Sequence, residues 1–385
     1  MRDSVLIIAP YLGLVNRGTE SFSVEIAHRL ADRFAVTLVS GGPVAPSGTG
    51  YEQFVLDEFA PPLGARVATK LFDWLSRLSA GGLRALPAKA MLTTWSHVAP
   101  LLPPYLYQQA FMAFLGQSGL VDRFWTCVFP QSGPPGVAWA ARLRHTRGSR
   151  ILYTGHGGVG PGEERILARR PDAYVAISQM AFEWARSRAP NVHYVPNGIP
   201  VERFVPAGSL AERAPIVLSV GALTSFKRHE LVVRAMELVP DARLHIVGAG
   251  ELRQTIEAEC RLRIPGRFAM EEAGYDRMPA IYNEARLFTL PSAAEPMGLV
   301  YLEALASGLP CVAPDDRLRR DLLKEQAIYA DVEDPEAYAA AIRRGLSMIT
   351  GAEERSTFVA HNYSWERVAA AYTEIIERLC GEPRR

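Results

Sequence analysis

Two glutamates stand eight residues apart in the stretch EPMGLVYLEALASGLP, which spans residues 295–310. Glu295 lies in an expected loop, and Glu303 lies among the apolar residues of an expected helix. A carboxylate in such surroundings is costly unless it accepts hydrogen bonds. The 2′,3′-diol of a ribose offers two hydroxyl donors to one carboxylate. The stretch therefore indicates a nucleotide-binding site, with an exposed Glu303 on a surface helix as the alternative.

The helix that carries Glu303 is expected to begin near residues 298–300 and to be closed by Gly308, because glycine permits the left-handed C-terminal conformation. The backbone amides of Gly298, Leu299 and Val300 would then form the positive end of the helix dipole, which accepts phosphate. With Glu303 they predict a site for a nucleoside diphosphate sugar. Glu295 is expected either to hold sugar hydroxyls or to fix the loop.

Short apolar runs alternate with helical patterns along most of the chain, which is typical of parallel sheets covered on both faces. The pattern restarts after the Pro- and Gly-rich segment 194–215, so a linker is expected there. Two α/β domains follow from this pattern and from the length of 385 residues. The expected strands are 5–10, 35–40, 124–129, 150–155, 172–178, 216–223, 244–250, 286–292 and 309–314.

The composition is that of a soluble globular protein, with 48% hydrophobic and 22% charged residues. The sequence contains no run of about 18 apolar residues, so no transmembrane helix is expected. The first residues read as a buried strand without a signal-peptide cleavage pattern, so a cytoplasmic protein is expected. The four cysteines are scattered without a Cys-x-x-Cys pair, so neither a zinc site nor a disulfide framework is predicted. Nothing in the sequence suggests a nucleic-acid partner.

Basic charge is concentrated in residues 60–150, which hold ten Lys and Arg against two Asp and Glu. Residues 60–120 also carry many Leu and aromatic residues. Helices with this composition occur at lipid interfaces, so peripheral contact with the inner face of a membrane is one interpretation. Helices packed on the sheet, with a solvated basic face, are the other.

The order of these features resembles that of retaining glycosyltransferases of family 4, the Glu-x7-Glu type with GT-B architecture. The similar segments are SVGALTSFKRHELVVRA (219–235), VPNGI (195–199) and YSWERVAAAY (363–372). The resemblance implies two Rossmann-like domains whose parallel sheets face across a cleft. Residues 1–198 would form the acceptor-side domain and 199–362 the nucleotide-sugar domain. Residues 363–385 would form a helix that crosses back, with Ser364 as its N-cap.

The resemblance makes Lys227 a ligand of the donor diphosphate, where an ammonium would neutralise charge on the leaving group. Gly221 and Arg228 would belong to the same phosphate site. The family usually has an arginine five residues before the lysine, but Ala222 stands there. Whether Arg228 or His229 replaces that cation stays open.

The resemblance also places His156 near the donor sugar, where a neutral imidazole would polarise the sugar or donate to it. The family commonly has Gly-Gly-x-Glu after its first strand, and Arg17-Gly18-Thr19-Glu20 keeps the second glycine and the glutamate. The amides of Gly18 and Thr19 are expected to face phosphate or acceptor. Arg17 adds a cation for an anionic acceptor.

The predicted function is a retaining hexosyltransferase-type glycosyltransferase that uses a UDP or GDP sugar as co-substrate, with no further cofactor. No Asp-x-Asp motif occurs, so metal-independent transfer is expected. The acceptor would be a glycan, a lipid-linked sugar or a small metabolite, with polysaccharide biosynthesis as one setting. A nucleotide-sugar epimerase and a non-catalytic nucleotide-sugar-binding protein are the alternatives. The donor sugar, the linkage and the oligomeric state are not predicted.

Overall fold

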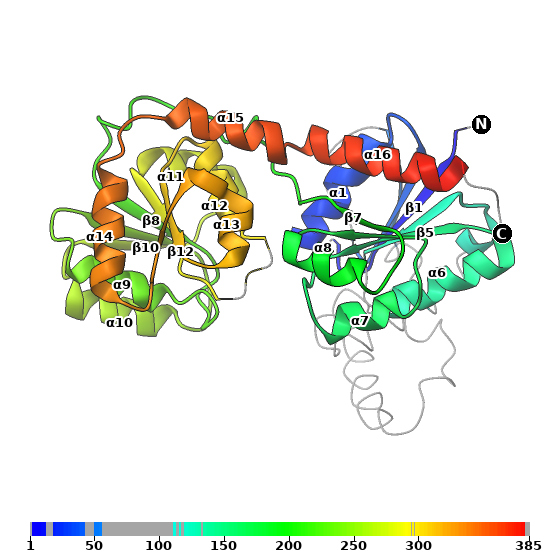
Figure 1. Cartoon of the computed structure of the whole chain (residues 1–385), viewed down its shortest axis with the longest axis horizontal. Coiled ribbons are helices and arrows are strands. Elements are labelled where there is room, and N and C mark those ends of the chain that lie inside the picture. Colours follow the sequence, from blue (N-terminus) through cyan, green and yellow to red (C-terminus); the bar gives the residue numbers. More distant parts are fainter. Residues whose placement is uncertain are drawn as a thin grey trace, which may run out of the picture. The chain divides into compact units, whose positions relative to one another are not determined.

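The structure is a computed structural model of the chain, and it describes residues 2–12, 18–42, 50–55, 111–112, 115–116, 119–131, 134–293, 295 and 297–381. The chain forms two compact units. Unit 1 comprises Met1–Val195 and Ala369–Arg385, and unit 2 comprises Pro196–Val368. Both units contain a parallel sheet with helices between successive strands (Figure 1).

Unit 2 is built on a six-stranded parallel sheet with the order β10-β9-β8-β11-β12-β13. Counted from β8, this is the order 3-2-1-4-5-6 of a Rossmann-like domain. The strands are β8 (Ile216–Val220), β9 (Arg243–Val247), β10 (Phe268–Glu271), β11 (Leu287–Thr289), β12 (Cys311–Pro314) and β13 (Ala327–Ala330).

Helices cover both faces of the unit 2 sheet (Figure 1). Leu287 and Phe288 point to opposite faces because side chains alternate along a strand. Leu287 belongs to the core cluster formed with α9 (His229–Glu237), α10 (Arg253–Arg263) and α14 (Pro335–Leu346). Phe288 instead contacts aromatic rings of α11 (Met278–Glu284) and α12 (Leu299–Ala306). The remaining helices of this unit are α13 (Arg317–Leu323) and α15 (Ala352–Tyr363).

Unit 1 has a seven-stranded parallel sheet with the order β3-β2-β1-β4-β5-β6-β7. The order again reverses between the first strand and the fourth. The strands are β1 (Ser4–Ala9), β2 (Ala35–Ser40), β3 (Glu52–Val55), β4 (Cys127–Pro130), β5 (Arg150–Gly155), β6 (Ala173–Ala176) and β7 (Val192–Tyr194). The main helices are α1 (Gly18–Leu30), α6 (Pro134–Arg147), α7 (Pro161–Leu167), α8 (Gln179–Arg186) and α16 (Trp365–Gly381).

The C-terminal helix α16 completes one face of unit 1. The Tyr372 ring stacks on Phe129 of β4 and meets Phe22 of α1 edge-on. Its hydroxyl lies 2.7 Å from Thr154 Oγ1. As expected, Ser364 caps this helix, since its Oγ accepts a hydrogen bond from Arg367 N.

The predicted fold class is confirmed as two parallel-sheet α/β Rossmann-like domains. Each of the nine expected strands overlaps an observed one. The strands β3, β7, β10 and β13 were not predicted. All four lie at the edges of their sheets, where burial is partial and no continuous apolar run is needed.

Gly308 ends α12 with φ +81°, and a Cβ there would lie 2.8 Å from Ala352 Cβ. We expect Gly308→Ala to lower the free energy of unfolding of unit 2 by roughly 2–4 kcal/mol, from backbone strain and the clash together. Gly266→Ala is the matched control, because Gly266 has φ +72° but open space around it. It should lose about 1 kcal/mol.

The two units can unfold separately, so the loss is best measured by native-state hydrogen exchange of unit 2 peptides under urea. Equal losses in both variants would contradict the contribution assigned to the Ala352 contact.

Candidate functional site

The loops after β8 and β11 meet where the strand order of unit 2 reverses. Open α/β sheets bind ligands at this point, outside the carboxyl ends of the strands. β8 leads into residues 221–228 and β11 into residues 290–298. The two loops are joined by a backbone hydrogen bond in which Ala293 N donates to Phe226 O over 2.8 Å. Two loops in direct contact therefore carry five of the predicted site residues, Gly221, Lys227, Arg228, Glu295 and Gly298.

Lys227 and Glu295 form an ion pair across these loops. Lys227 Nζ lies 2.7 Å from both carboxylate oxygens of Glu295. Both side chains are about four-fifths buried, so water screens the pair only partly. The alkyl stem of Lys227 passes beside Gly221, where an added Cβ would lie 3.5 Å from the lysine Cγ and Cδ. The structure thus brings Lys227, Glu295 and Gly221 together.

A buried arginine, Arg319, supports this ion pair through Ser292. Ser292 Oγ donates to Glu295 Oε2 over 2.8 Å and accepts from Arg319 Nη2, also at 2.8 Å. Arg319 is 3% exposed and binds Asp316 at 2.9 Å. Ser292 and Arg319 were not predicted as site residues, because neither lies in the stretch 295–310 that starts at Glu295 or in the segments that carry the family resemblance.

The turn into α12 places Glu295 beside the start of the helix. Gly298 is the N-cap residue, with φ +67° and ψ +53°. A Cβ at Gly298 would lie 3.2 Å from the Tyr301 ring and 3.9 Å from Glu295 Cγ. Leu299 and Val300, the first two helical residues, are half-buried. Their amides belong to the first turn, whose donors point out of the helix end.

Glu303 is buried in the second turn of α12, with 7% of its surface exposed. Tyr282 donates a 2.8 Å hydrogen bond to Oε2, and Tyr275 donates a 3.3 Å hydrogen bond to Oε1. Burial raises the pKa of Glu303 to about 7, while the two tyrosine donors and the charge of Arg203 oppose the rise. A buried helical carboxylate supplied with hydroxyl donors replaces the alternative of an exposed glutamate.

Arg228 and His229 are both engaged elsewhere. Arg228 Nε donates to Pro291 O over 2.7 Å, and its guanidinium is paired with Glu333. His229 is fully buried, with Ser219 Oγ 3.1 Å from Nδ1. Burial lowers the pKa of His229 to about 4, so it is uncharged at neutral pH. His229 therefore does not supply the cation missing at Ala222, and Arg228 is the alternative that carries a charge.

His156 follows β5 in unit 1 and lies beside the end of β4. Its Nε2 is 2.8 Å from Oε1 of Gln131, the residue that follows β4. The Phe22 ring meets the imidazole edge-on, with centroids 5.0 Å apart. Burial lowers the pKa of His156 to about 4, so the ring is neutral at physiological pH. A neutral imidazole is the form that the resemblance implies for this residue, and its contact with a sugar stays a prediction.

A second buried carboxylate supports the turn that carries His156. Glu163 of α7 accepts from Gly157 N and from the Tyr174 hydroxyl, both at 2.9 Å. Burial raises its pKa, and the two donors oppose the rise. Glu163 was not predicted, although GEE at 162–164 follows the glycine-rich turn in the sequence.

Some of the predicted site residues cannot be placed beside a ligand-binding loop, because they lie at or beyond the limits of the described residues. Arg17 falls outside the described residues, as does most of the segment 60–120 expected at a membrane. Gly18 and Thr19 are the first two residues of α1. Within the described ranges, no cluster of three His, Cys, Asp or Glu could hold a metal ion. No helix in these ranges combines the length and apolar character needed to cross a membrane.

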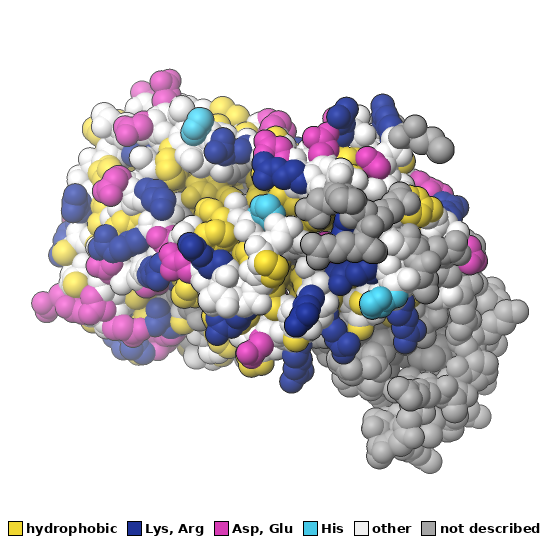
Figure 2. Space-filling model, turned by 45° about the vertical axis from the view of Figure 1, so that its right-hand side comes forward, with side chains coloured by type: hydrophobic (Ala, Val, Ile, Leu, Met, Phe, Trp, Pro, Cys, Tyr) yellow, Lys and Arg dark blue, Asp and Glu magenta, His cyan; other side chains and the backbone are white. Residues whose placement is uncertain are grey.

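The described part of the basic segment is largely neutralised. Arg123 pairs with Glu52, while Arg144 and Arg150 both approach Asp172. On the face shown in Figure 2, basic and acidic side chains are interspersed over the described residues. These three arginines therefore already have acidic partners.

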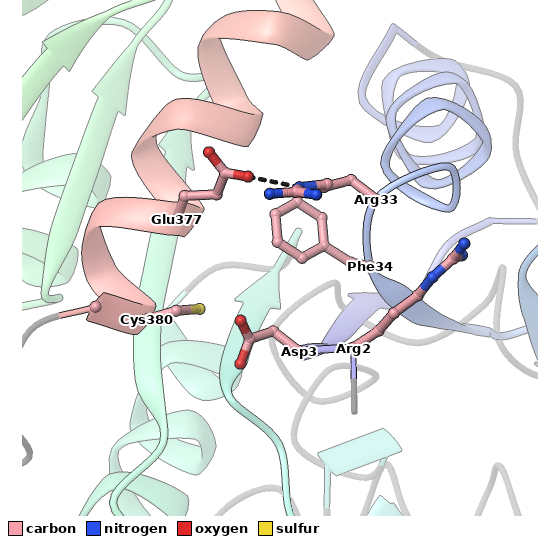
Figure 3. A pocket seen from close by; sticks show the side chains of 7 residues that line it. Arg2, Asp3, Arg33, Phe34, Glu377 and Cys380 are labelled. Carbon is pink, nitrogen blue, oxygen red and sulfur yellow. Dashed lines mark hydrogen bonds and ion pairs between the residues drawn. The ribbon is translucent and has the colours of Figure 1, made fainter.

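A cavity of about 670 Å³ lies in unit 1 near the amino ends of β1 and β2, lined by Arg2, Asp3, Arg33, Phe34, Glu377, Cys380 and Gly381 (Figure 3). Arg33 and Glu377 are paired at 2.6 Å across it. Burial raises the pKa of Cys380 to about 12, so its thiol is protonated. The cavity is at the opposite strand ends from Gln131 and His156, and Arg33 and Glu377 neutralise each other across it, so it is not the candidate functional site.

Comparison with known proteins supports a glycosyltransferase family. Residues 201–377 match the family model described as glycosyl transferases group 1. A phosphatidyl-myo-inositol mannosyltransferase of Mycobacterium tuberculosis is 26% identical over 257 residues, which cover 61% of this chain and 66% of the relative. A glycosyltransferase of Methanocaldococcus jannaschii is 29% identical over 169 residues, covering 40% of this chain and 42% of the relative. The match thus spans less than two thirds of either relative.

Solved structures match over nearly the whole chain. Anabaena HepE, crystallised with UDP and glucose, has a TM-score of 0.69 at 15% identity and covers 97% of this chain and 99% of its own. Sucrose-phosphate synthase from Thermosynechococcus elongatus has the same TM-score at 19% identity, covering 98% and 99%. At these identities the match shows the fold, which is that of GT-B glycosyltransferase structures.

The raised pKa of Glu303 makes the stability of unit 2 depend on pH. The folded state binds this proton more tightly than the unfolded state, so the contribution is present below the unfolded pKa of 4.5 and is lost as pH rises through about 7. We expect wild-type stability, measured relative to Glu303→Gln, to fall by roughly 3 kcal/mol between about pH 5 and about pH 8.

Urea unfolding followed by hydrogen exchange in unit 2 measures this difference. Glu212→Gln, at an exposed glutamate of the same unit, is the control and should show no such trend. A pH-independent difference between wild type and Glu303→Gln would contradict the burial of an acid that titrates near neutrality.

Proposed function

We propose that this chain is a retaining glycosyltransferase that transfers a sugar from a nucleoside-diphosphate sugar to a hydroxyl acceptor without a metal ion. The observation that carries the proposal is the arrangement at the strand-order reversal of unit 2. There the Lys227–Glu295 ion pair stands beside the start of α12, and Glu303 is buried in the next turn.

Lys227 and the first turn of α12 would hold the diphosphate. An ammonium and a helix N-terminus both stabilise the negative charge that develops on the leaving nucleoside diphosphate. Because Lys227 is paired with Glu295, the diphosphate would share or replace that partner. This arrangement supplies the positive charge for which other enzymes use a metal ion.

Glu303 would hold the ribose of the donor. Its two oxygens already accept hydrogen bonds from tyrosine hydroxyls, which occupy the places that ribose hydroxyls would take or share. Tyr275 is 43% exposed, so a ligand can reach and displace it. Glu295 would orient the sugar, as its side chain is held at the helix start by Lys227 and Ser292.

His156 would contact the sugar as a neutral donor or acceptor. No step of the proposed reaction requires it to be charged, in agreement with its lowered pKa. Retention of the anomeric configuration rests on the family resemblance. The acceptor hydroxyl would attack the anomeric carbon from the same face from which the nucleoside diphosphate leaves. The leaving phosphate would take the proton of that hydroxyl.

More than one class of acceptor is compatible with the proposed reaction. The names of the relatives include a phosphatidyl-myo-inositol mannosyltransferase and an alpha-maltose-1-phosphate synthase, and these do not single out one acceptor. A lipid-linked sugar, a glycan and a small metabolite are all to be screened. A membrane-associated acceptor would agree with the composition of residues 60–120.

Nucleotide binding is the direct test. A thermal-shift screen of UDP and GDP sugars identifies the donor, and calorimetry then compares variants. Lys227→Ala and Glu303→Gln should each weaken donor binding by roughly 1–3 kcal/mol, the scale of a lost charged or buried partner. Lys324→Ala, at an exposed lysine of the same unit, should leave affinity unchanged.

Unchanged donor affinity in both site variants would refute the assignment of the site. Two further outcomes separate the alternatives. A donor whose sugar is epimerised without acceptor would indicate an epimerase, and binding without any turnover across the acceptor screen would indicate a binding protein. NMR of the product's anomeric carbon tests retention.

A further inference from the structure

Among the residues that the structure describes, the side chain of Gln131 carries a buried donor without a partner. Gln131 is 6% exposed, and its Nε2 makes no hydrogen bond to any of these residues. Its backbone amide donates to Ile8 O of β1 over 2.7 Å, which places it at the point where the strand order of unit 1 reverses. An unmade hydrogen bond at a buried amide is destabilising and therefore needs an explanation.

The oxygen of the Gln131 carboxamide determines which ring nitrogen of His156 carries the proton. A neutral imidazole carries one N–H, and the partner of either nitrogen decides which one carries it. Gln131 Oε1, 2.8 Å from His156 Nε2, accepts a hydrogen bond and so requires the Nε2–H tautomer. Nδ1 is then left with a lone pair that can accept.

The imidazole has little freedom to turn away from this partner. The Phe22 ring lies edge-on at 5.0 Å. Before the histidine, the backbone at Gly155 packs closely on Tyr174, because a Cβ at Gly155 would lie 1.8 Å from the Tyr174 hydroxyl. After it, Gly157 N donates a hydrogen bond to Glu163. These contacts on both sides hold His156 in place, which suits a residue that must present one hydrogen-bonding pattern to a ligand.

We propose that Gln131 and His156 form a binding subsite for a sugar hydroxyl, in which Gln131 Nε2 donates to the hydroxyl oxygen and also, through Oε1, holds His156 in the Nε2–H tautomer. This proposal rests on the proposed function for the identity of the ligand as a sugar. A hydroxyl group matches the pair because it can accept from the amide and donate to an imidazole lone pair. The sugar is that of the donor or of the acceptor.

The first experiment measures the tautomer and needs no ligand. Long-range ¹H–¹⁵N spectra of protein labelled in histidine, with His156 assigned from His156→Gln, should show Nε2 protonated and Nδ1 unprotonated. Gln131→Leu should shift the nitrogen resonances of His156 toward a mixture of tautomers. An Nδ1–H tautomer in wild type, or unchanged resonances in Gln131→Leu, would overturn the assignment.

The second experiment measures ligand binding. With the nucleotide sugar that gives the largest thermal shift, Gln131→Leu should weaken binding about 10-fold while affinity for the matching nucleoside diphosphate stays within about 2-fold. If the hydroxyl belongs to the acceptor, KM for the acceptor rises instead and donor affinity is kept. If neither quantity changes, the subsite does not exist.

Stability distinguishes this role from a purely structural one. Gln131→Leu removes one unpaired donor but also takes the acceptor from the Nε2–H of His156, which is destabilising unless the ring changes tautomer. Gln131→Leu should therefore lower Tm by no more than about 10 °C although it loses binding. A large drop in Tm would mean that Gln131 serves the fold. Gln179→Leu on α8 is the matched control in the same unit.

If no nucleotide sugar binds wild type, the proposed function fails while this inference can still be decided. Titration with glucose, mannose and galactose should then move the side-chain resonances of Gln131 and His156 in wild type and not in Gln131→Leu. Absence of such movement would reject the subsite on its own.

Discussion

The reversal of strand order between β8 and β11 is the constraint on which the proposed site depends. All strands of unit 2 are parallel, so their carboxyl ends lie at one edge of the sheet. α9 follows β8 onto one face, and α12 follows β11 onto the other. The two loops therefore start side by side and then diverge. Lys227 and Glu295 meet at 2.7 Å although 68 residues separate them.

Both units use a buried glutamate with a tyrosine donor, but the two glutamates are used differently. Glu163 accepts from Tyr174 and from the backbone amide of Gly157, so its capacity is committed to holding a turn. Glu303 accepts from Tyr282 and, more weakly, from Tyr275, which is partly exposed. One position around Glu303 can therefore be exchanged for a ligand donor, whereas an exchange at Glu163 would release the turn that carries His156.

The sequence was sufficient for the central strands and for the helix that carries Glu303, because both have local signatures. A buried parallel strand must be apolar on both faces, as in IVLSV of β8. Edge strands such as β10 (FAME) need not be apolar on both faces, so their sequences did not predict them. Arg319 and Gln131 were also missed, since their roles come from contacts with Ser292 and His156 across strands. No spacing within the chain encodes such contacts.

The network behind Glu295 explains how Lys227 could change partner without disturbing the site. Glu295 has two supports, the ammonium of Lys227 and the hydroxyl of Ser292. The hydroxyl is in turn held by Arg319, which is almost fully buried and bound to Asp316. If an anion drew Lys227 away, Glu295 would keep its bond to Ser292, whose hydroxyl stays held by Arg319. A carboxylate with one mobile and one fixed support can thus remain oriented while its counter-ion turns to the ligand.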